Sequence, residues 1–199
     1  LWTLNDSGNA PELFAIDTRG GALATCRIEN TRNTDWEDLA SFRLAGAYYL
    51  MIADTGDNDS KRDDCALLVV REPGEKERAA DRILTLPVAW TLRFRYEDGP
   101  RDCESVAVDA AAGRVLLLSK RTKPPVLYEL PLLPGTNGAV LVARRIIAVA
   151  SLPPKVKGRR RAFWTQPTAM DIASDGSALA VLTYSDAYLY ERRPEESWA

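Results

Sequence analysis

Three acidic residues recur in this chain at one interval. Glu37, Glu104 and Asp171 are spaced 67 positions apart, and each begins a short apolar run. A regular interval of this length indicates structural repeats, so we expect the three acids to occupy equivalent places in space. Carboxylates that meet at close range repel one another unless a cation or bound protons neutralise them. Clusters of oxygen ligands suit Ca²⁺, or Mg²⁺ with retained water, so the interval predicts a metal site.

Other polar residues that could do chemistry gather in the segments between predicted strands. In a metal-dependent hydrolysis, Asp54 or Asp102 could take a proton from the attacking water, and Lys120 could stabilise developing negative charge. The residues predicted to contact a ligand are Asp6, Asn9, Asp57, Asn58, Arg121, Tyr184 and Asp186.

Turn formation is the competing interpretation of several of these residues. Asp6, Asp54 and Asp57 lie close to Gly8 or Gly56, where aspartate commonly caps backbone amides, and turn formation is the favoured interpretation there. For Glu37 and Glu104 the two interpretations are balanced, because glutamate is a poor turn former. A basic run from Lys155 to Arg161 is more typical of a solvated loop than of an anion site, although both stay open.

Composition excludes several classes of function. The net charge of −2 argues against a general nucleic-acid binder, and no apolar stretch is long enough to span a bilayer. The chain has no histidine, which excludes a Ser-His-Asp triad, a histidine base and a histidine-ligated zinc site. Three cysteines, without a Cys-x-x-Cys pair, are interpreted as buried free thiols.

The elements that must position these residues are short strands. Apolar runs bounded by Gly, Pro, Asn and Asp recur along the chain, and helical periodicity is almost absent. The first full repeat is expected to hold strands at 38–42, 48–53, 66–71 and 83–96, the last interrupted near Pro87. The second is expected to hold strands at 105–109, 114–119, 126–130 and 139–150. Partial repeats flank both, with strands at 1–4, 13–17 and 23–29 and at 170–173, 177–183 and 188–192.

Four strands in each 67-residue repeat predict a β-propeller made of four-stranded antiparallel blades. The predicted arrangement is a partial ring with a partial blade at 1–30, full blades at 35–98 and 102–151, and a partial blade at 167–199. A β-sandwich is the alternative, but it does not explain a regular internal interval. In a propeller, the loops that carry nearly all the candidate residues would lie on one face, with Glu37, Glu104 and Asp171 around the mouth of the central channel.

Four segments resemble a group of bacterial β-propellers. They are Leu1–Asn9 (LWTLNDSGN), Asp35–Leu39 (DWEDL), Ala53–Asn58 (ADTGDN) and Thr183–Tyr190 (TYSDAYLY). They are similar to mostly uncharacterised proteins related to NHL, gluconolactonase-like and phytase-esterase-like propellers. The resemblance implies a propeller that is often exported, so a periplasmic or exported location and a cytoplasmic one both stay open. It also implies a divalent cation at the channel mouth, for which Glu37 and Glu104 match the position of a glutamate ligand.

Two functions remain open from the sequence. The first is a binding or scaffold propeller that takes a small molecule or a protein on its polar face. The second is a divalent-metal-dependent hydrolase acting on a lactone or a phosphate ester. The chain begins in mid-strand, and open sheet edges are a liability. We therefore expect either a fragment or a homodimer in which each chain contributes half of the ring.

Overall fold

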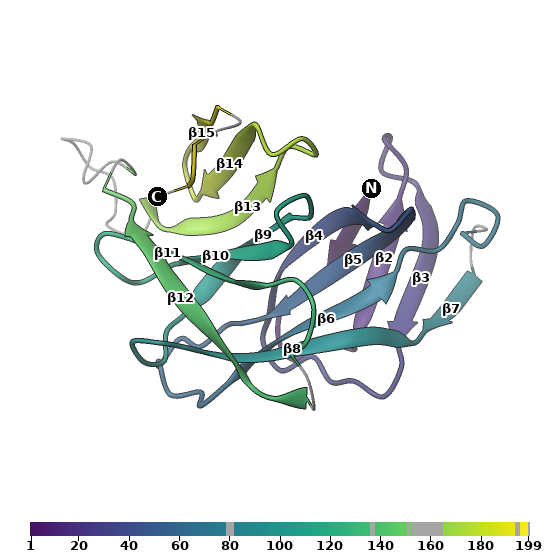
Figure 1. The fold of residues 1–199 in the computed structure, drawn as a ribbon. Coiled ribbons are helices and arrows are strands. Elements are labelled where there is room, and N and C mark those ends of the chain that lie inside the picture. Colours follow the sequence, from purple (N-terminus) through teal and green to yellow (C-terminus); the bar gives the residue numbers. More distant parts are fainter. Residues whose placement is uncertain (79–81, 136–137, 151, 153–164, 194–195, 199) are drawn as a thin grey trace.

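The structure, a computed structural model, describes the chain except for residues 79–81, 136–137, 151, 153–164, 194–195 and 199. The basic run from Lys155 to Arg161 lies outside the described residues. Within the described part the regular elements are strands arranged in three sheets (Figure 1). None of the described segments forms a helix with the length and apolar character needed to cross a bilayer.

The blades are numbered in chain order, and the largest sheet contains two of them, each with four antiparallel strands. The second blade consists of β4 (Trp36–Leu44), β5 (Ala47–Asp54), β6 (Cys65–Arg71) and β8 (Val88–Tyr96). The third blade consists of β9 (Cys103–Asp109), β10 (Arg114–Ser119), β11 (Val126–Pro131) and β12 (Leu141–Ala148). The two are joined at their outer strands, where a short part of β12 pairs in parallel with the end of β8.

The N-terminal sheet, called the first blade, takes its outer strand from far along the chain. It consists of β1 (Trp2–Leu4), β2 (Glu12–Ile16), β3 (Ala22–Ile28) and β7 (Arg82–Leu86), with β7 parallel to β3. The prediction of one interrupted strand over 83–96 is therefore wrong. Pro87 has no backbone N–H and cannot continue a ladder, so the chain divides there between two sheets. β8 then resumes with Val88 opposite Val70 in the second blade.

The last sheet, called the fourth blade, has three described strands. They are β13 (Pro167–Ile172), β14 (Ala178–Thr183) and β15 (Ala187–Glu191), in antiparallel order. β13 lies against β9 and β4, the innermost strands of the third and second blades. The inner strands of three blades therefore meet at the centre of the molecule, as Figure 1 shows.

Each of the two middle blades is buried on both faces. In β5, Leu50 and Ile52 pack toward the first blade, whereas Met51 and Ala53 pack toward the third. β10 repeats this alternation, because its even-numbered leucines, Leu116 and Leu118, join the core shared with the fourth blade. Side chains alternate across a strand, so one β-strand can contribute to two cores.

Consecutive sheets that stack face to face around central inner strands form a β-propeller, which confirms the predicted all-β propeller fold. A β-sandwich would bury one face of each sheet and does not account for three successive cores. The three cysteines are buried and free, as predicted.

Candidate functional site

A β-bulge lies at the start of β4, β9 and β13, the inner strands of the second, third and fourth blades. In β4, Glu37 is the additional residue, because its neighbours Trp36 and Asp38 pair with consecutive residues of β5. In β9 the corresponding irregularity contains Glu104 and Ser105. A bulge adds an unpaired residue and redirects its side chain, and bulges are common beside functional sites. The bulges place Glu37 and Glu104 in equivalent positions, as their spacing predicts.

Asp171 does not share that position. The bulged residue of β13 is Thr168, because the interval from Cys103 to Pro167, which occupy equivalent pairs, is 64 residues rather than 67. The expected threefold equivalence is therefore wrong by three residues in the fourth blade. Asp171 is exposed, and its Oδ1 accepts the N–H of Ile172 at 2.8 Å. It is absent from the carboxylate groups formed by the described residues.

Glu37 is the shared member of two groups of carboxylates. The first contains Asp6, Asp35 and Glu37, and the second contains Glu37, Asp102 and Glu104. Within each group the potential ligand atoms all lie within 4.8 Å of one another. Asp6 comes from the first blade, Asp35 and Glu37 from the second, and the other two acids from the third. We call these five residues the acid rim.

The acid rim strongly disfavours charge on Glu37. Burial, followed by the negative charges of Glu104 and Asp35, raises the pKa of Glu37 to about 9. Burial also raises the pKa of Asp35, while a hydrogen bond from Ser7 opposes that effect. Among the described residues, Glu37 pairs with no lysine or arginine and accepts no hydrogen bond. It is therefore the carboxylate of the acid rim that gains most from a proton or a cation.

Two basic residues already neutralise the third-blade side of the acid rim. The Lys120 ammonium is buried, pairs with Glu104 and donates to the Tyr184 hydroxyl at 2.9 Å. Although burial lowers the pKa of Lys120, these two hydrogen bonds raise it overall. Nε of Arg121 donates to Oδ2 of Asp102 at 2.7 Å.

Asp102 is almost completely buried, and both of its oxygens are engaged. Oδ1 accepts the N–H of Asp57 at 3.0 Å, and Oδ2 accepts from Arg121. Arg121 also donates to the side-chain oxygen of Asn58. These bonds join the β5–β6 loop of the second blade to the beginning of the third blade, so Asp102 connects two blades.

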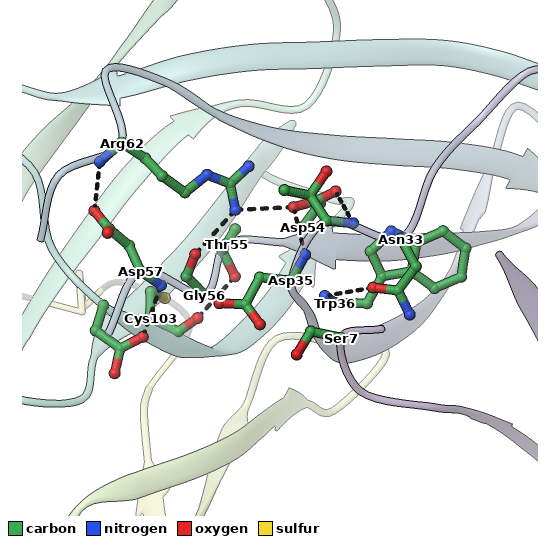
Figure 2. Close-up of polar contacts among 12 residues, drawn as sticks. Ser7, Asn33, Asp35, Trp36, Asp54, Thr55, Gly56, Asp57, Arg62 and Cys103 are labelled. Carbon is green, nitrogen blue, oxygen red and sulfur yellow. Dashed lines mark hydrogen bonds and ion pairs between the residues drawn. The ribbon is translucent and has the colours of Figure 1, made fainter. Parts of the chain in front are cut away.

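Asp54 and Asp57 hold the β5–β6 loop in shape. Arg62 donates to Oδ1 of Asp54 and to the carbonyl of Gly56, each at 2.9 Å, as Figure 2 shows. The carboxylate of Asp57 accepts the N–H groups of Lys61 and Arg62 at 2.8 and 2.9 Å. The turn interpretation therefore accounts for the contacts of both aspartates.

The remaining predicted residues lie in two turns. The Asn9 side chain donates to the Asp6 carbonyl at 3.0 Å, and Oδ1 of Asp6 accepts the N–H of Ser7. In the β14–β15 turn, the Asp186 carbonyl accepts the N–H of Thr183 at 2.9 Å. Asp6 belongs to the acid rim as well as to its turn, whereas Asn9 and Asp186 belong to neither carboxylate group.

Asp35 is a member of the acid rim that the sequence interpretation missed. It precedes Asp102 by the same interval that separates Glu37 from Glu104, and this was the available signal. The backbone carbonyls of Asp35 and Asp102 have matching roles, because they accept the N–H of Gly56 at 3.1 Å and of Lys120 at 3.0 Å.

Gly56 lies directly beneath the carboxylates of Asp35 and Glu37. A Cβ added at this glycine would come too close to Oδ2 of Asp35 and Oε1 of Glu37. Two carboxylate oxygens from different residues therefore converge over one Cα, where a side chain would displace them (Figure 2 shows Gly56 beside Asp35). Converging carboxylate oxygens are the donor set of a hard divalent cation.

No family model matches the chain, and no curated protein matches it. Several solved structures are similar to it, and two of them are described here. The β-propeller domain of Cps50 (Swd1) from Myceliophteria thermophila shares 14% identity with a TM-score of 0.40, over 92% of this chain and 51% of that one. The WD40 domain of Pan2 from Neurospora crassa shares 9% identity with a TM-score of 0.33, over 94% of this chain and 71% of that one. The chain spans about half the length of the first of these structures.

Proposed function

We propose that this protein is a ligand-binding β-propeller whose acid rim holds one divalent cation through Asp6, Asp35 and Glu37. The observation that carries the proposal is the state of Glu37. Its carboxylate lies among four others and has no basic partner in the described part of the chain. A carboxylate in that setting is either protonated or bound to a cation.

The two groups within the acid rim differ in how far they are neutralised. Lys120 pairs with Glu104, and Arg121 pairs with Asp102, so internal cations already balance two of the three carboxylates in the second group. Asp6 and Asp35 form no ion pair with a described residue. The first group is therefore where an added cation gains the most electrostatic energy.

Calcium fits this donor set better than magnesium does. The three carboxylates come from two different blades, and two of them belong to loops rather than to strands. Ca²⁺ accepts six to eight oxygens in a flexible geometry, whereas Mg²⁺ requires a near-ideal octahedron at about 2.1 Å.

The contacts of the candidate catalytic residues favour binding over hydrolysis. Asp54 is paired with Arg62, and Asp102 uses both of its oxygens in the bonds between two blades. A general base needs a free oxygen within reach of the attacking water. The favoured role is therefore the binding of a small molecule or a protein at the polar face, organised by the cation.

The test is a titration of the purified chain with CaCl₂ and, separately, MgCl₂, followed by thermal melting and calorimetry. A cation that binds only the folded state raises the melting temperature, and its stabilisation is about 2.7 kcal/mol at a concentration of one hundred times Kd. We expect the wild type and the control Asp171→Asn to respond, and Glu37→Gln to lose most of the response. An unchanged melting temperature in the wild type, or the same shift in all three proteins, would refute the proposal.

A further inference from the structure

One carboxylate links the inner strands of three blades. Oδ1 of Asp38, in β4, accepts the N–H of Leu39 at 2.9 Å. Its Oδ2 accepts the N–H of Val106, in β9, at 2.8 Å, and the N–H of Met170, in β13, at 3.2 Å. The second, third and fourth blades therefore each direct a backbone donor at the same side chain.

The three donors occupy one register position. Leu39, Val106 and Met170 each lie just beyond the bulge of their own strand. An innermost strand has no neighbour on one edge, so its N–H groups there need another acceptor. At the centre of the propeller, three such groups converge, and the Asp38 carboxylate accepts all of them.

Converging backbone N–H groups form an anion-binding site, and a carboxylate is a strong acceptor for them. Asp38 forms no ion pair with a described residue and belongs to neither carboxylate group. Its interactions are with the backbones of the three inner strands, and the nearby charge of Asp171 on β13 is repulsive. Its arrangement differs from that of Glu37, the residue before it, which points into the acid rim.

We infer that Asp38 is a positioning residue: its buried carboxyl group accepts three converging backbone N–H groups and thereby holds Glu37 and Glu104 at their separation in the acid rim. Glu37 precedes Asp38 in β4, and Glu104 lies two residues before the donor Val106 in β9. A change in the spacing of β4 and β9 at Asp38 therefore changes the distance between the two glutamates. The effect on cation binding rests on the proposed function, whereas the role of Asp38 as the acceptor of three backbone N–H groups does not.

Chemical rescue tests the role of Asp38 directly. Asp38→Ala removes the carboxylate and leaves room for a small carboxylic anion, whereas Asp171→Asn removes a nearby negative charge without removing an acceptor of the three N–H groups. The melting temperature of each variant and of the wild type is measured in sodium formate and in sodium chloride at equal ionic strength. We expect Asp38→Ala to melt below the wild type and to be raised selectively by formate, with no selective effect of formate on the other two proteins.

The effect on the acid rim is measured by calcium titration of the same proteins. Loss of a residue that orients cation ligands typically weakens metal affinity by about 10- to 100-fold, and we expect a loss of that size in Asp38→Ala with partial recovery in formate. Asp38→Asn keeps one acceptor oxygen and should fall between the wild type and Asp38→Ala. If Asp38→Ala fails to fold, refolding in formate against chloride gives the same comparison.

Two results would overturn the inference. One is an Asp38→Ala variant that melts at the wild-type temperature. The other is a formate effect of the same size in every protein, or no gain from formate in either folding or melting of Asp38→Ala. If the wild type binds no calcium, the proposed function fails, and the formate comparison still decides the role of Asp38.

Discussion

The backbone N–H of Asp57 donates to Oδ1 of Asp102 at 3.0 Å, and this hydrogen bond joins the β5–β6 loop to the segment before β9. Both residues are buried, and the other oxygen of Asp102 pairs with Arg121. A buried donor that loses its acceptor costs about 1–3 kcal/mol. Asp102 is therefore one of several links between the second and third blades, beside the pairing of β8 with β12 and the hydrogen bond from the Thr55 hydroxyl to the Cys103 carbonyl at 2.7 Å.

Replacement of Asp102 should therefore act on stability. We expect Asp102→Ala to lower the free energy of unfolding by about 2–3 kcal/mol, because it leaves the Asp57 N–H without an acceptor and Arg121 without its ion pair. Asp102→Asn retains an acceptor oxygen and should cost about half as much. Urea unfolding measures both values. Wild-type stability in Asp102→Ala would show that the two blades do not depend on this bond.

Replacement of Gly56 should act on the acid rim more than on stability. A methyl group at Gly56 would displace the tips of Asp35 and Glu37, which are flexible side chains, rather than the backbone. We expect Gly56→Ala to weaken calcium binding by about tenfold, a loss of about 1.4 kcal/mol. Calorimetric titration measures the affinity. Gly135→Ala is the matched control, since a Cβ there would make an ordinary contact with Leu141 at 3.5 Å. Equal affinities in the two variants would argue against cation binding over Gly56.

Lys120→Met should destabilise the calcium-free protein and strengthen its binding of calcium. Breaking a buried ion pair leaves an uncompensated charge and costs about 3 kcal/mol or more, so the calcium-free variant should be less stable. Glu104 then becomes available to the cation, and one additional charge about 4 Å away contributes about 1 kcal/mol or more to binding. Urea unfolding with and without calcium shows both effects. Lys61→Met removes an exposed lysine paired with Asp59 and should change neither.

The stability of the calcium-free protein should decrease with rising pH because of Glu37. Its pKa is about 9 in the folded protein, compared with an ordinary value of 4.5, so the folded state binds a proton that the unfolded state has released. The contribution of Glu37 to stability is complete below pH 4.5 and is lost as the pH rises to about 9. Glu37→Gln should remove this part of the slope. Burial also raises the pKa of Asp38, to about 7, so Asp38 contributes a second decrease of stability with pH, below about pH 7. This decrease should persist in Glu37→Gln. Urea unfolding from pH 5 to pH 9 provides the comparison.

The same protonation predicts that calcium binding releases protons. At pH 7 the cation must displace the proton of Glu37, so about one proton should leave for each ion bound, and the affinity should increase toward pH 9. Calorimetry in two buffers with different ionisation enthalpies counts the released protons. A binding enthalpy that does not depend on the buffer would contradict protonation of Glu37.

The strands were predictable because their signals are local. Apolar runs end at Gly, Pro and Asp, and the expected strands of the second and third blades lie close to the observed ones, except for 83–96, which divides between two sheets. The equivalence of Glu37 and Glu104 was also predictable, because the bulges of β4 and β9 are separated by the same interval as the two glutamates. Asp171 was wrongly placed because the interval between the equivalent residues Cys103 and Pro167 is three residues shorter than the interval between Trp36 and Cys103. An interval in sequence cannot distinguish equivalent positions from coincidence when successive blades differ in length.

Asp38 could not be assigned from the sequence for a different reason. Its partners are backbone N–H groups of two strands that lie 68 and 132 residues further along the chain. Backbone donors are present in every residue except proline, so the sequence carries no mark of where they converge. The direction of the side chain is set by the bulge at Glu37, which becomes visible only when β4 is paired with β5.

The position of β7 has a consequence for biosynthesis. β3 ends at Ile28, but its outer partner begins only at Arg82, after the inner part of the second blade has been made. At a synthesis rate of about 5–20 residues per second, the outer edge of β3 stays uncovered for several seconds on the ribosome. Of the four described blades, the first blade is therefore the first to be translated, but it is completed only after β4, β5 and β6 have been made.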